Sequence, residues 1–121
     1  MANFGDYVRS RRAEVGLTLR QFCVDADLDP AYVSRVERGL RQAPSDLAML
    51  RRWAKFLFIR PESREWEEFS DLASISAGRL PEDLLSDEEV ADKLPMLFRT
   101  LRSDQPPEEA LRKIVDIVRR G

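Results

Sequence analysis

The 121-residue chain contains no histidine and only one cysteine, and both shortages restrict its chemistry. Cysteine and histidine are the main zinc ligands, and histidine is the commonest general acid or base in enzymes. No stretch approaches the roughly 18 apolar residues of a membrane span, and the polar start MANFGDYVRS has no signal-peptide character. We therefore expect a cytoplasmic protein with no metal, no cofactor, no catalytic residue and no membrane partner.

The charge of the chain is distributed unevenly, although hydrophobic residues (43%) and charged residues (35%) are typical of a globular protein. Residues 1–60 hold 11 Lys and Arg against 7 Asp and Glu, whereas residues 61–121 hold 9 against 15. The halves thus carry net charges of +4 and −6, which give the overall −2. A basic half attracts the phosphates of nucleic acids. The acidic half suits a solubilising or partner-binding role.

Apolar residues recur every three or four positions along the chain, which predicts an all-α fold. We expect main helices over residues 4–15, 19–26, 30–38, 45–59, 61–78, 87–103 and 106–121, with Pro95 kinking or dividing the sixth. The fourth should begin at a capping Ser45 and bury a stripe made of Leu47, Leu50, Ala54 and Leu57. Pro61 marks the predicted boundary between a domain of residues 1–60 and an acidic helical extension of residues 61–121.

Residues 17–39, LTLRQFCVDADLDPAYVSRVERG, have the layout of two short helices joined by a tight turn. Thr18 is a good N-cap for the first helix, and Asp29 caps a second helix that starts at Pro30. Cys23 falls on the apolar face of the first helix, where we expect it to pack in the core. Asp27 lies in the turn and tolerates the left-handed conformation better than most residues. Such a pair of helices places the second one in the major groove of DNA.

The segment YVSRVERG, preceded by TLRQFCVDADLDP and followed by a proline five residues on, resembles the XRE or Cro/CI-type family of phage and bacterial regulators. The resemblance covers residues 4–58. It implies a lambda-repressor-like head of four to five helices, which here carries a helical C-terminal extension. It also implies that the head binds double-stranded DNA, and hence that the protein is associated with the nucleoid.

The second motif helix should read bases through the side that faces away from Val33 and Val36. Arg35 is the strongest candidate because a guanidinium can donate two hydrogen bonds to one guanine, and the resemblance also implies base contacts there. Pro30 offers no donor and Ala31 only a methyl group, so DNA shape should contribute to specificity. The predicted base-reading residues are Pro30, Ala31, Ser34 and Arg35.

Phosphate contacts should come from the edges of the same unit, where helix N-termini, hydroxyl groups and arginines meet the DNA backbone. The candidates are Thr18, Leu19, Arg20, Tyr32, Arg38 and Arg41. The resemblance implies the role of Arg38, and Leu19 stands where many relatives carry glutamine. The resemblance also implies a structural ion pair between Arg12 and Glu37 inside the domain.

These features favour a homodimeric transcriptional regulator, expected to be a repressor, that binds an inverted-repeat operator. One alternative is an antitoxin that autoregulates its operon and binds a toxin through the C-terminal half. Another is a protein-interaction module that keeps the fold without operator recognition, which the poor readout at Pro30 and Ala31 suggests. The apolar faces of the last two helices either form a dimer interface or cover the core of the same chain.

Overall fold

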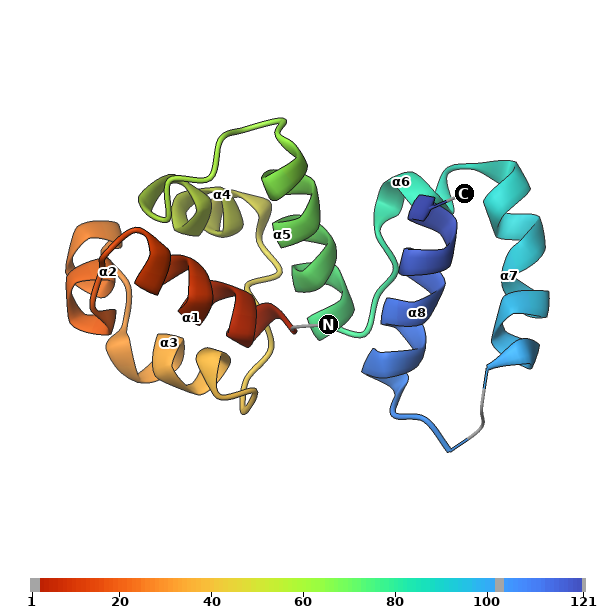
Figure 1. Ribbon diagram of the computed structural model, residues 1–121, viewed down its shortest axis with the longest axis horizontal. Helices are drawn as coiled ribbons and strands as arrows, with labels where there is room; N and C mark the ends of the chain where they lie inside the picture. The colour runs from red at the N-terminus through yellow and green to blue at the C-terminus, as the bar shows by residue number, and fades with distance from the viewer. Residues whose placement is uncertain (1–2, 102–103, 121) are drawn as a thin grey trace.

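The computed structural model describes residues 3–101 and 104–120, and all regular secondary structure in this part is helical (Figure 1). The predicted all-α class is therefore confirmed. In chain order the helices are α1 (Phe4–Glu14), α2 (Leu19–Ala26), α3 (Pro30–Glu37), α4 (Leu47–Phe56), α5 (Arg64–Ser76), α6 (Glu82–Leu85), α7 (Glu88–Thr100) and α8 (Pro107–Arg120). Pro95 lies inside α7 without dividing it.

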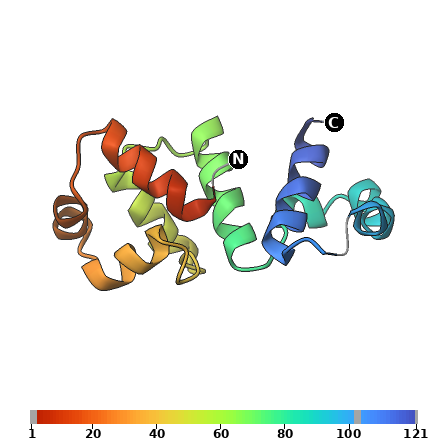
Figure 2. The ribbon, with the colours of Figure 1, turned by 60° about the horizontal axis from the view of Figure 1, so that its bottom comes forward.

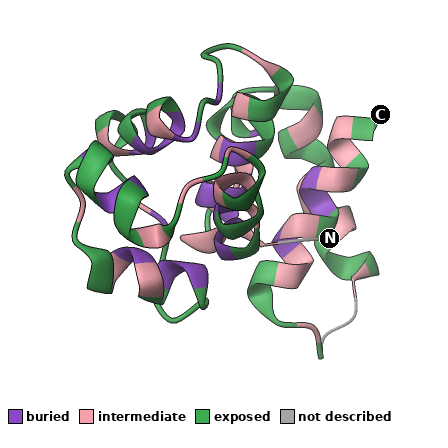
Figure 3. Ribbon diagram, turned by 60° about the vertical axis from the view of Figure 1, so that its left-hand side comes forward, coloured by how far each residue is buried: buried purple, intermediate pink, exposed green. Residues whose placement is uncertain are grey.

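Helices α1 to α5 surround the larger of two hydrophobic cores. We call these five helices and their core the head. Trp53 of α4 is fully buried, and its indole lies 5.7 Å from the ring of Phe22 and 5.9 Å from that of Phe4, measured between ring centroids. Phe69 of α5 packs on Phe4 at 5.1 Å. The head core therefore extends past the predicted boundary at residue 60 and includes α5. Figure 3 shows buried positions on the sides of the helices that face one another.

The start of α4 differs from the prediction by one residue. Asp46, and not Ser45, caps the helix, because its carboxylate accepts a hydrogen bond from the Ala48 N–H at 3.0 Å. Leu47 is then the first helical residue and is 55% exposed, so its predicted burial is wrong. Trp53 takes the inner position, because it lies three residues after the buried Leu50 on the same helix face.

A glycine allows α1 to lie directly against α3. A Cβ atom at Gly5 would lie only 2.4 Å from the carbonyl oxygen of Val36 and 2.7 Å from that of Glu37. Any larger residue would push the two helices apart, because both obstacles are backbone atoms. This close approach fixes α3 relative to the rest of the head.

Helices α6, α7 and α8 form a second, smaller unit, which we call the tail (Figure 2). Its core consists of Leu84, Leu111 and Val115 packed against Ile75, which belongs to α5. Helix α5 thus contributes to the head core with one face and to the tail core with another. Figures 1 and 2 show α8 beside α5, while α7 lies on the far side of the tail from the head.

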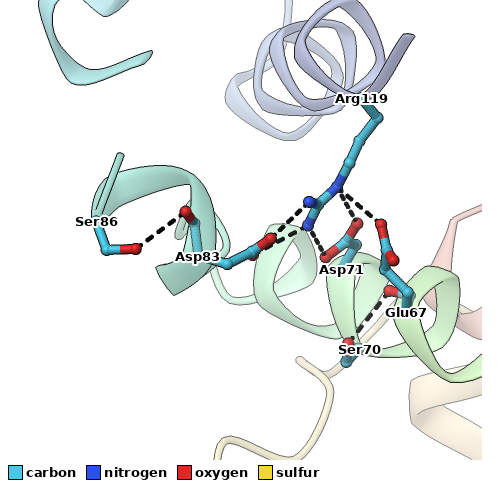
Figure 4. A network of polar contacts seen from close by, with 6 residues as sticks. All are labelled: Glu67, Ser70, Asp71, Asp83, Ser86 and Arg119. Carbon is cyan, nitrogen blue, oxygen red and sulfur yellow. Dashed lines mark hydrogen bonds and ion pairs between the residues drawn. The ribbon is translucent and has the colours of Figure 1, made fainter. Parts of the chain in front are cut away.

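Arg119 of α8 contacts three carboxylates, two on α5 and one on α6, and so ties the tail to α5 (Figure 4). Its guanidinium donates to Asp71 at 2.9 and 3.0 Å and to Asp83 of α6 at 2.6 and 3.0 Å, and Glu67 lies 3.3 Å away. These bonds lower the pKa of Asp83. Burial raises the pKa of Asp71 despite the same partner, because its side chain is only 13% exposed.

Candidate nucleic-acid interface

Helices α2 and α3 and the turn between them are each fixed by local hydrogen bonds. Thr18 Oγ1 accepts from the Gln21 N–H at 3.0 Å, and Asp29 Oδ1 accepts from the Ala31 N–H at 3.1 Å. Asp27 takes the left-handed conformation at φ 55° and ψ 55°, as expected for the turn. Pro30 occupies the first turn of α3, where its missing N–H costs nothing. The predicted bounds of α2 and the predicted start of α3 are confirmed, whereas α3 ends at Glu37, one residue earlier than predicted.

The inner side of α3 is buried, and its outer side is open to solvent. Val33 and Val36 are at most 2% exposed and belong to the head core. Of the predicted base-reading residues, Pro30, Ala31 and Arg35 are exposed and Ser34 is half-buried. The Arg35 side chain has no hydrogen bond or ion pair within the described part of the chain. The structure thus brings these four residues together on one rigid helix and leaves the guanidinium available.

The predicted phosphate-contacting residues lie around the two helices. Thr18 and Arg20 are exposed at the start of α2, and Leu19 is half-buried. The N–H groups of this first turn have no carbonyl partner within the helix, which is the usual arrangement for phosphate binding. Arg38 follows α3 and makes one long hydrogen bond, from Nε to the Ser34 carbonyl oxygen at 3.4 Å.

Tyr32 has an intramolecular role that the sequence did not indicate. Its hydroxyl donates to the Gln42 carbonyl oxygen at 3.0 Å, and its ring packs edge-on against Trp53. The Arg41 guanidinium lies 6.0 Å from the centre of the same ring. Tyr32 therefore holds the loop after α3 against the head. A phosphate contact from this hydroxyl would compete with the bond to Gln42, so that role stays a prediction.

Arg12 and Glu37 form a bidentate ion pair between α1 and the last turn of α3. Arg12 Nε lies 2.8 Å from Glu37 Oε2, and Nη2 donates to Oε1 at 2.9 Å. Arg12 Nη1 also donates to the Leu17 carbonyl oxygen, which fixes the loop before α2. The hydrogen bonds to Glu37 raise the pKa of Arg12. Because the Glu37 side chain is only 5% exposed, this pair is part of the structural support of α3.

Arg11 supports the head from the other side of α1, which the sequence did not reveal. It donates to the carbonyl oxygens of Leu57 and Phe58 at 2.9 and 2.7 Å, at the end of α4. The partners lie 46 and 47 residues away, so no local pattern predicts the contact. Arg11 and Arg12 together connect α1 to both α3 and α4.

Three further observations concern properties other than DNA binding. Cys23 is buried as expected, and burial raises the pKa of its thiol, so it remains a neutral core group at pH 7. Within residues 3–101 and 104–120, no cluster of three or more potential ligands is arranged to hold a metal ion. No helix in that part is long and apolar enough to cross a membrane.

A family model described as a helix-turn-helix domain matches residues 3–72, and the chain belongs to this family. The match runs from the N-cap of α1 into α5, so it covers most of the head and includes α2 and α3. Membership makes the protein a DNA-binding regulator through its head. No curated protein and no solved structure matches the chain.

Proposed function

We propose that the protein is a sequence-specific transcriptional regulator of the XRE or Cro/CI type, which binds an inverted-repeat operator as a homodimer. It acts as a repressor by occupying the operator and obstructing polymerase, and it is not an enzyme. The observation that carries this proposal is the way α3 is held and exposed. Its inner side is anchored in the head, while the Arg35 guanidinium is exposed and has no partner in the described part.

Arg35 is the main source of base specificity in this proposal. A guanidinium that donates to N7 and O6 of a guanine contributes about 1–3 kcal/mol of discrimination against other bases. Pro30 and Ala31 are exposed beside it and cannot form such bonds. Specificity therefore also depends on the shape of the DNA between and beside the contacted bases.

Affinity for the phosphates comes from the start of α2 and from the arginines around α3. Thr18 and Arg20 contact one stretch of DNA backbone, while Arg38 and Arg41 contact another. Every phosphate contact releases bound cations from the DNA, so the affinity falls steeply as salt concentration rises. A single head covers few base pairs. Pairing of two heads about a twofold axis allows recognition of two half-sites about 34 Å apart.

Enrichment of duplexes from a random DNA pool tests the proposal, with the wild type compared to Arg35→Ala and Arg64→Ala. Arg64 is an exposed arginine at the start of α5, and Figure 1 shows the start of this helix across the head from α3. We expect the wild type and Arg64→Ala to select the same palindromic site. Arg35→Ala should bind with relaxed specificity at one position of each half-site. Melting curves confirm that each variant is folded.

The outcome also separates the alternative functions. Failure of the folded wild type to enrich any sequence at low salt would contradict the repressor proposal and favour an interaction module. An antitoxin would still enrich its own operator, and would in addition bind a protein through α6 to α8. Weak salt dependence of DNA binding would also contradict the proposed phosphate contacts.

A further inference from the structure

Helix α7 is amphipathic but poorly covered by the rest of the chain. None of its thirteen residues, all within the described part, is buried. Val90, Leu94, Leu97 and Leu101 are half-buried and recur every three or four residues, so they mark the side of the helix that faces α6 and α8. The remaining apolar residues of α7, which are Ala91, Pro95, Met96 and Phe98, are exposed.

A second apolar stripe runs beside the first, and its three residues are exposed. Ala91, Pro95 and Phe98 have the same spacing of four and three residues, and Phe98 is 47% exposed. Phe98 also borders a groove of about 820 Å³ between the tail and the head, together with the exposed Leu47 of α4 and Leu85 of α6. The large ring of Phe98 thus stands beside the smaller side chains of Ala91 and Pro95, next to a groove that both apolar and polar side chains line.

The charges that flank this stripe indicate what covers it. Asp92 and Arg99 lie seven residues apart, so they share one side of the helix next to the stripe. Both are exposed, and neither has an ion-pair partner within residues 3–101 and 104–120. If a second α7 packs antiparallel to the first, Asp92 of one copy lies opposite Arg99 of the other, twice. The same register places Phe98 of each copy between Ala91 and Pro95 of its partner.

A parallel arrangement has neither advantage. It would bring Asp92 beside Asp92 and Phe98 beside Phe98, and it would align the two helix dipoles unfavourably. An interface between two identical chains about a twofold axis must be self-complementary, and an antiparallel pair of α7 helices meets this condition in both shape and charge.

We propose that α7 is the dimerisation helix, and that the antiparallel α7 of a second copy covers the Ala91–Pro95–Phe98 stripe and the adjoining groove. This inference rests on the proposed homodimeric function and names its interface. The helix pair alone is small compared with a standard interface, so the free dimer dissociates readily. Adjacent operator half-sites hold two copies at high effective concentration, which favours the pairing on DNA.

Sedimentation equilibrium of the full chain, without DNA, tests the interface. Phe98→Glu should raise the dimer dissociation constant at least about tenfold, because it places a carboxylate against an apolar surface. Met96→Glu is the matched control, since Met96 is similarly exposed at 53% on the same helix but points away from the stripe. It should leave the constant within about twofold. A monomeric wild type at high micromolar concentration, or equal effects of the two substitutions, would overturn the proposal.

A charge exchange tests the antiparallel register without changing the apolar surface. Asp92→Arg and Arg99→Asp should each weaken the dimer severalfold, because each places like charges opposite one another. The double variant restores both pairs and should return the constant to near the wild-type value. A double variant whose loss of dimer affinity equals the combined losses of the two single variants would exclude this register. Circular dichroism confirms that helix content is unchanged in each variant.

DNA binding separates a failure of this interface from a failure of the proposed function. Phe98→Glu should keep its affinity for a duplex that carries one half of the enriched site and lose affinity for the complete site. A wild type that dimerises through α7 but enriches no DNA would contradict the regulator proposal alone. A wild type that binds the complete site as two independent monomers would contradict the dimerisation helix and the homodimer, and would leave the proposed sequence-specific DNA binding intact.

Discussion

The head and the tail are stabilised very differently. Among the residues that the structure describes, the head core contains sixteen buried ones, with Trp53 and Phe22 in the middle and ion pairs at its edges. The tail core contains four, and one of these, Ile75, is supplied by α5 of the head. The head can therefore hold α3 rigidly for recognition. The tail depends on α5 for its core and leaves α7 largely uncovered, which suits a unit that completes itself with a second copy.

The largest effect that we predict comes from removing Glu37, the buried ion-pair partner of Arg12 at the end of α3. Glu37→Ala leaves Arg12 unpaired inside the head and should cost about 3–5 kcal/mol of stability, with loss of DNA binding through unfolding. Glu14→Ala is the control, because Glu14 is 70% exposed in its pair with Arg11 and should cost less than about 1 kcal/mol. Thermal melting checks both. A Glu37→Ala protein with wild-type melting and no DNA binding would assign Glu37 to the DNA contact instead.

A truncation on the buried side of α8 should separate the two regions. Ile114→Ala removes a fully buried side chain and should destabilise the tail by about 2–5 kcal/mol. Because the head has its own core, we expect a half-site duplex to bind with unchanged affinity. Hydrogen exchange should show faster exchange in α8 and unchanged protection in α1 to α4. Uniformly faster exchange would instead indicate one cooperative unit, and would contradict the contrast between the regions.

Removing the Arg119 guanidinium, which links the tail to α5, should have an intermediate effect on stability. Arg119→Met leaves the half-buried Asp71 without its cationic partner while keeping the aliphatic stem of the side chain, and should cost about 1–3 kcal/mol. Arg120→Met is the control, since Arg120 is 78% exposed and pairs only within α8 among the described contacts. Urea unfolding measures both. Equal stability of the two variants would show that the apolar contacts alone hold α8 on α5.

The smallest effect that we predict is a change in how the melting temperature depends on acid pH. The pKa of Asp83 is lowered in the folded protein by the Arg119 hydrogen bonds, so its contribution is present above its ordinary value of 3.8 and is lost as the pH falls through the folded value. Burial shifts the pKa of Asp71 the other way, which partly offsets this loss. Asp83→Asn should therefore weaken the fall in melting temperature between about pH 4 and pH 2. An unchanged acid profile would show that the Arg119 contact to Asp83 is unimportant in solution.

Local signals account for what the sequence predicted well. Thr18, Asp29 and Pro30 determine the starts of α2 and α3, and both starts agree with the structure because N-capping depends on neighbouring residues. The Arg12–Glu37 contact was expected only from the family resemblance.

The errors concern long-range contacts. The boundary at residue 60 was placed by Pro61, but Phe69 packs on Phe4, 65 positions earlier in the chain. Spacing alone put Leu47 on the inner face of α4, although the rest of the protein leaves this residue 55% exposed. The contacts of Arg11 and Tyr32 to distant backbone carbonyls have no signature in the sequence.

Hydrogen exchange of the wild type with and without its enriched duplex tests most directly the claim that the head reads DNA and the tail pairs the copies. We predict that DNA slows amide exchange at residues 18–20, at the start of α3 and in the loop of residues 38–42. We also predict weaker protection along α7, which Phe98→Glu abolishes while protection of the head remains. Protection confined to α7 and α8, with none at α2 or α3, would contradict the account.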